Sequence, residues 1–287
     1  MIAGAMWDFS PDEWFFFAAA AVVAVVGAVL WYMPLARVST LGRATGVRMA
    51  LAGVPVVCVV LLVVVLDKWA DPVSVAGHPD YVTLFLVGGA AWLFATGVSC
   101  FPFLGISVRD DAVERGNTAA VVVACGAVVG ITLAYAQSNI GTGPTIWTTL
   151  VPAFFATLGL FVTWIVAEVI GGIAEAVTVD RDVASAIRLA ALLVASGAIL
   201  GRAMAGDWTD WRSTFVDFAA QGWPAIALAV ASGVAHRALR PTPQRPRPAV
   251  VPLGIIPAVI LFVIAAGWLV YLGKPFVKPL LPELPSR

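Results

Sequence analysis

The sequence predicts an all-α protein, a polytopic bundle of about eight transmembrane helices that contains a parallel internal duplication of a two-span unit. Two observations predict the membrane class. Hydrophobic residues make up 61% of the chain and charged residues 12%, whereas soluble domains have about 45–50% and about 25%. The apolar residues also form long unbroken runs, which favour membrane helices over the alternating pattern of a barrel.

A bilayer core about 30 Å thick needs about 20 apolar residues per helix. Eight stretches meet this need, and only the fifth, sixth and seventh carry charges within them. In chain order the predicted spans are residues 15–35, 49–66, 82–103, 118–136, 146–170, 183–204, 215–235 and 250–272.

The distribution of basic residues predicts the orientation. Eleven of the 17 Lys and Arg fall on one set of loops and adjoining span ends, which the positive-inside rule places in the cytoplasm. Both termini are therefore expected to be extracytoplasmic. The 17 acidic residues balance the basic ones, so we expect no nucleic-acid partner.

The chain divides into three regions around an internal repeat. Residues 1–81 hold two spans, residues 82–206 hold the two-span unit twice (82–136 and 147–206), and residues 207–287 hold two further spans joined by a basic, proline-rich cytoplasmic loop. At an offset of about 65 residues, Asn117 aligns with Asp182. Both copies run in the same direction, so the duplication is parallel.

Two features of the repeat suggest roles for its residues. Asn117 and Asp182 each precede an outward helix, where they either cap it or form a polar pair at an anion site made by helix N-termini. Small residues four apart let helix backbones approach closely. On this pattern we expect the two units to pack through Gly126, Gly130, Gly197 and Gly201.

In the first copy an acidic loop is followed by Gly116-Asn117 and an alanine-rich helix. This pattern resembles a bacterial inner-membrane family catalogued as domain of unknown function number 350, and the resemblance covers roughly residues 82–206. The second copy departs from the pattern with Arg181-Asp182 in place of Gly-Asn. The resemblance implies a multi-pass protein of the inner membrane and brings no settled activity. The matching residues are Glu114, Arg115, Gly116, Asn117, Ala119 and Ala120.

Charged residues within spans are costly and suggest function. Glu168 and Arg188 lie at similar depth on the fifth and sixth spans, so we expect an ion pair. The alternatives are a proton or cation site at Glu168, or a side chain that reaches back to the membrane surface. Arg202 and Asp217 form a second candidate pair near the outer face, with Arg202 also able to reach the interface.

No arrangement typical of a catalytic centre occurs. His78 and His236 are the only histidines, too few for a multi-histidine metal site, and no phosphate-binding loop or nucleophile motif is present. We therefore expect no enzyme, no metal and no cofactor.

Two hypotheses for function remain. The first is an accessory or structural subunit of a membrane assembly, with a membrane or cytoplasmic protein partner or a second copy of the chain besides the lipid bilayer. The second is a small-solute or ion transporter with its pathway between the two repeat units, using Glu168, Arg188, Asn117 and Asp182. Pro34, Pro55, Pro152 and Pro224 lie near span ends or in otherwise ordinary helices. The absence of broken helices favours the first hypothesis.

Overall fold

The computed structural model describes residues 9–37, 45–70, 75, 77–242 and 249–273. Within these ranges the fold is entirely helical, and eight helices are long and apolar enough to cross a membrane. The predicted fold class is confirmed as an all-α bundle. The described part leaves out both termini and much of the proline-rich loop. The spanning helices are α1 (Pro11–Arg37), α2 (Thr45–Trp69), α3 (Pro79–Ser99), α4 (Thr118–Gln137), α5 (Trp147–Gly171), α7 (Val183–Met204), α8 (Trp211–Leu239) and α9 (Ile256–Tyr271).

The helices start and stop at polar signals beyond the apolar runs. At the start of α1, Ser10 and Glu13 form a capping box, in which each side chain accepts a hydrogen bond from the other residue's backbone N–H. Four of the spanning helices, α1, α2, α4 and α8, are longer than the predicted stretches, α8 most clearly. Short helical segments that the sequence did not predict fill the connections. They are η2 (Pro102–Leu104), η3 (Val108–Glu114), α6 (Ile173–Thr178) and η4 (Val251–Ile255).

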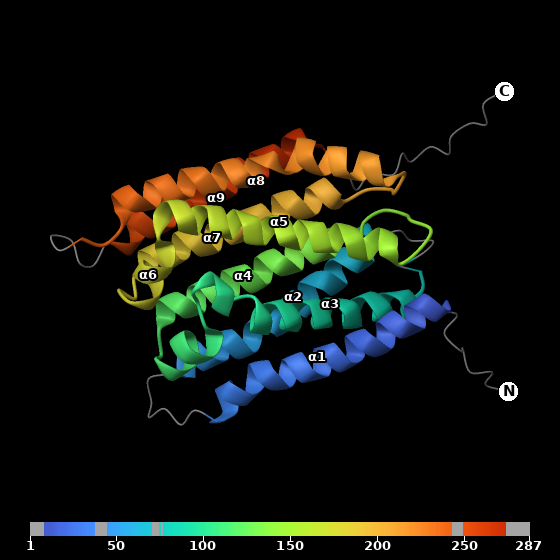
Figure 1. The fold of residues 1–287 in the computed structure, drawn as a ribbon, viewed down its shortest axis with the longest axis horizontal. Coiled ribbons are helices and arrows are strands. Elements are labelled where there is room, and N and C mark those ends of the chain that lie inside the picture. The colour runs from blue at the N-terminus through green and yellow to red at the C-terminus, as the bar shows by residue number, and fades with distance from the viewer. Residues whose placement is uncertain (1–8, 38–44, 71–74, 76, 243–248, 274–287) are drawn as a thin grey trace.

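Helices α4 and α7 form the centre of the bundle (Figure 1). On one side α2 packs against α4 and α1 against α3, and on the other side α9 packs against α7 and α8 against α5. Figure 1 shows α1 along one edge of the bundle and α8 with α9 along the opposite edge. The first two and last two spans thus flank the central helices and do not form a bundle of their own.

The α4–α7 contact is a direct approach of two backbones. A Cβ atom built on Gly126 would lie 2.5 Å from the Cβ of Ala190, and one built on Gly197 would lie 2.2 Å from the Gly130 carbonyl oxygen. Gly201 lies equally close to the backbone of α4. All four glycines assigned to helix packing therefore lie at this contact, where side chains would keep the helices apart.

The two central units share local geometry at an offset of 65 residues. The N–H of Asn117 donates to the carbonyl of Asp111, and the N–H of Asp182 donates to the carbonyl of Ala176. Just before these caps, Gly116 and Arg181 both adopt a left-handed conformation, with φ of 58° and 55°. The linkers that follow α4 and α7 also meet side by side. Equivalent positions contact each other directly in two hydrogen bonds, Trp92 Nε1 to Thr157 Oγ1 and Thr142 Oγ1 to Asp207 Oδ1.

Two prolines inside spanning segments each release a carbonyl group for another helix. A proline has no N–H for the carbonyl four residues before it, so Pro55 frees Leu51 and Pro257 frees Leu253. The indole Nε1 of Trp31 on α1 donates to the Leu51 oxygen at 3.0 Å, and the Arg188 guanidinium on α7 donates to the Leu253 oxygen.

The Gly197→Ala variant tests the α4–α7 contact. Its new Cβ would meet backbone atoms that have no room to move, so we expect the free energy of unfolding to fall by about 1–3 kcal/mol. Gly267→Ala is the matched control, because nothing lies within 4 Å of a Cβ at this α9 position. Unfolding of both purified variants in detergent measures the difference, and equal stabilities would contradict the contact.

The left-handed Arg181 generates a second prediction. Non-glycine residues in this conformation cost about 1–2 kcal/mol, and the Arg181 side chain is exposed. Arg181→Gly should therefore stabilise the protein by about 1 kcal/mol, and Gly116→Ala should destabilise it by a similar amount. Unfolding curves of both variants check this, and a loss of stability in Arg181→Gly would show that the arginine side chain matters more than its backbone.

Candidate functional site

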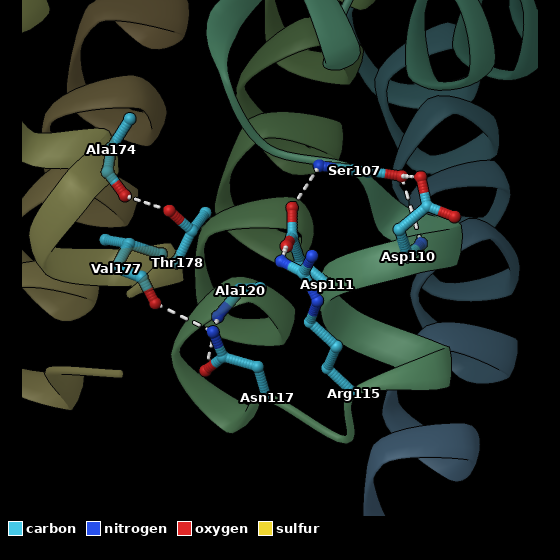
Figure 2. Close-up of polar contacts among 9 residues, drawn as sticks. All are labelled: Ser107, Asp110, Asp111, Arg115, Asn117, Ala120, Ala174, Val177 and Thr178. Atoms are coloured by element: carbon cyan, nitrogen blue, oxygen red, sulfur yellow. Dashed lines mark hydrogen bonds and ion pairs between the residues drawn. The ribbon is translucent and has the colours of Figure 1, made fainter. Parts of the chain in front are cut away.

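Asn117 lies at the start of α4 and ties the two central units together. Its Oδ1 accepts hydrogen bonds from the N–H groups of Ala119 and Ala120 at 3.0 and 3.4 Å, as a cap does. Its Nδ2 donates to the carbonyl oxygen of Val177 on α6 at 2.7 Å, as Figure 2 shows. The side chain is buried, so both ends of its amide have structural partners.

The acidic residues of the loop before α4 pair within that loop. Asp111 accepts from the Ser107 N–H at 2.8 Å and from Arg115 at 2.7 Å (Figure 2). The Glu114 carboxylate accepts from Arg109 Nε at 3.0 Å and raises the pKa of that guanidinium through this hydrogen bond and its charge. These contacts order the loop. The carboxylates of Asp111 and Glu114 are each paired with an arginine of the same loop and do not point into a shared site.

Asp182 caps α7 as Asn117 caps α4, and it also begins a chain of buried polar groups. Its carboxylate accepts from the N–H groups of Ala184 and Ser185 at 3.2 and 2.9 Å. The hydroxyl of Ser185 donates to the same carboxylate. One turn further along α7, the Arg188 guanidinium donates to that hydroxyl at 3.0 Å. The positive end of α7 and the serine thus hold the Asp182 charge.

Arg188 joins three membrane segments. The guanidinium contacts Ser185 on its own helix, Nδ1 of His236 on α8 at 3.1 Å, and the carbonyl of Leu253 on η4. Arg188 is 6% exposed and His236 is 1% exposed, so both groups are inside the protein. We name Asp182, Ser185, Arg188, His236 and the Leu253 carbonyl the α7–α8–η4 cluster.

The donors in this cluster fix the protonation of His236. A guanidinium only donates hydrogen bonds, so Nδ1 of the imidazole must accept, and a neutral ring then carries its proton on Nε2. This Nε2 is buried and has no hydrogen-bond partner among the described residues. A buried N–H donor without an acceptor is unfavourable. The cluster therefore lacks one hydrogen-bond acceptor, the partner of the His236 Nε2–H.

The structure does not bring Glu168 and Arg188 together, so the expected ion pair is wrong. The chain turns back after α5 at Gly172, which is left-handed with φ of 66°. This turn places the N–H of Ala174 at 2.8 Å from Glu168 Oε2. Glu168 therefore holds the first turn of α6, while Arg188 points toward α8 and η4.

The second candidate pair, Arg202 with Asp217, which we weighed against placement of Arg202 at the interface, does not form. The Arg202 guanidinium donates to Gln221 Oε1 at 3.1 Å, one helical turn beyond Asp217 on α8. A helix places residues four apart on one face, and hydropathy alone does not say which of the two meets the arginine.

Sequence reasoning missed His236, Ser185 and Leu253 as members of the cluster. His236 was considered only as a metal ligand, and its position near the end of a long apolar helix gave no further signal. One signal was present in the sequence: Pro257 releases the Leu253 carbonyl inside the last span. A free carbonyl at membrane depth needs a donor from another helix.

No family model, no curated protein and no solved structure matches the chain. The resemblance of residues 82–206 to the inner-membrane family therefore stays a prediction, and the internal duplication stays one as well.

Proposed function

We propose that this integral membrane protein is a transporter of small anions, with the α7–α8–η4 cluster as its binding site. The proposal rests on one observation: a buried arginine and a buried imidazole N–H donor lie side by side, and the donor has no acceptor. An anion supplies acceptor oxygens or a halide to both groups. An ionisable residue inside a membrane is a functional-site hypothesis by default, because placing it there is costly.

The wider first turn of the last span supports transport over a purely structural role for the cluster. The last span begins with the wider turn η4, where the Ile256 N–H bonds to the Val251 carbonyl five residues back, and Pro257 then frees the Leu253 carbonyl. Transporters expose backbone groups at their sites where helices are irregular. Here the freed carbonyl accepts from Arg188, so a shift of η4 would release the guanidinium to an entering anion.

The proposed pathway differs from the one expected between the repeat units. The α4–α7 contact is closed by backbone atoms along its length, whereas the side chains of Arg188 and His236 lie between α7, α8 and η4. We therefore place the pathway between α7 and the pair α8 and η4–α9.

A structural subunit is the second candidate. The tight α4–α7 centre favours it, because a rigid core suits a protein that positions partners. This candidate expects a stoichiometric partner, or a second copy, to remain bound when the protein is purified from its own membrane.

Anion flux tests the transport proposal. Vesicles that contain the purified protein are loaded with potassium chloride, nitrate, acetate or phosphate, and valinomycin lets potassium leave so that anion exit limits the rate. We expect faster release of at least one anion than from empty vesicles. His236→Phe and Arg188→Met should each reduce it about tenfold, a loss of about 1.4 kcal/mol.

Arg202→Gln is the control, because it removes a buried arginine of the same helix outside the cluster. It should change the flux by less than about twofold, since distant sites act independently. Release no faster than from empty vesicles, or equal rates in wild type and His236→Phe, would contradict the proposal.

A further inference from the structure

A second polar site lies at the opposite end of the bundle. The cavity at this end measures about 320 Å³, near the lower end of the range of roughly 300–1,000 Å³ for small-ligand sites. It lies between the first turns of α1, α3 and α5 and the segment after α4. The side chains that matter for its chemistry are Glu13, His78, Tyr81, Phe85 and Asn139.

Glu13 supplies a buried carboxylate to this cavity. The residue is 9% exposed. Its Oε2 accepts from the Ser10 N–H at 2.7 Å and its Oε1 accepts from the Tyr81 hydroxyl at 3.1 Å. A carboxylate oxygen has two lone pairs, so each oxygen keeps one further acceptor position.

Asn139 supplies a second acceptor. Its Nδ2 donates to the carbonyl of Tyr135 at 2.7 Å, which requires the amide nitrogen on that side and fixes the orientation of the side chain. The other end, Oδ1, is buried and has no hydrogen-bond partner in the described structure. The residue is 3% exposed. Asn139 lines the cavity, and a bound donor reaches this oxygen by displacing the atoms that cover it.

The remaining walls select the kind of donor. Among the described residues, no lysine or arginine lines the cavity, whereas the side chains of Tyr81 and Phe85 do. Aromatic faces attract cations, and a carboxylate with a free amide oxygen calls for a cation that donates hydrogen bonds. A bare metal ion fits less well, because the described residues hold no group of three His, Cys, Asp or Glu side chains that could bind one.

We propose that this cavity binds a small primary ammonium ion, whose N–H groups donate to Glu13 and to Asn139 Oδ1 while its alkyl part lies against Tyr81 and Phe85. A quaternary ammonium has no N–H to donate and binds more weakly. The proposal is independent of anion transport, since the two sites share no residue.

Calorimetric titration of the purified full chain in lipid nanodiscs tests the site with ethylammonium chloride as the probe. We expect saturable binding that is at least about tenfold tighter than that of tetramethylammonium. Glu13→Gln should weaken ethylammonium binding at least about tenfold. This variant should fold, because glutamine serves equally well in the capping box. Asn139→Leu should weaken binding as well.

Asp12→Asn is the matched control. It removes a carboxylate from the same helical turn, but Asp12 is exposed and does not line the cavity. It should leave the dissociation constant within about twofold. Absence of saturable ethylammonium binding to the wild type, unchanged binding in Glu13→Gln, or equal weakening by Asp12→Asn would overturn the proposal.

Discussion

The close approach of the α4 and α7 backbones is the constraint on which the rest of the structure depends. Lipid tails are as apolar as the helix surfaces, so burial from water does not drive helices together within a bilayer. Small residues compensate by allowing backbone contact over a long path, and Gly126, Gly130 and Gly197 provide it here. The outer helices then pack on both sides of a fixed centre, and the loops before α4 and α7 are held against each other by Asn117.

The same scaffold carries different chemistry in its two halves. At the offset of 65 residues seen in the Trp92–Thr157 bond, Asn117, Ala120 and Val123 of α4 correspond to Asp182, Ser185 and Arg188 of α7. The three α4 residues cap the helix and pack, whereas the three α7 residues form a polar chain that reaches His236. This asymmetry places the proposed anion site on one side of the centre only.

The sequence was sufficient to predict the class, the number of spans and the glycines of the central contact, because hydrophobicity and small-residue spacing are direct consequences of the lipid environment. The caps at Asn117 and Asp182 were also predictable from their position before alanine-rich helices. The partners of Glu168 and Arg188 could not be predicted. The sequence gives the depth of each residue in the membrane, but it does not give which neighbouring helix each side chain faces. The turn at Gly172 brings the Ala174 N–H to Glu168, and Pro257 frees the Leu253 carbonyl that accepts from Arg188.

The central claim is that the two units meet within one chain, in register, along α4 and α7. A pair of cysteines at the touching linker residues tests it most directly: Thr142→Cys with Asp207→Cys, in a variant whose three native cysteines are replaced. Thr142 Oγ1 and Asp207 Oδ1 are 2.9 Å apart, close enough for a disulfide to form after oxidation in native membranes. The account predicts a monomer with an internal cross-link between the two peptides. Free thiols, or cross-links only between chains, would contradict it.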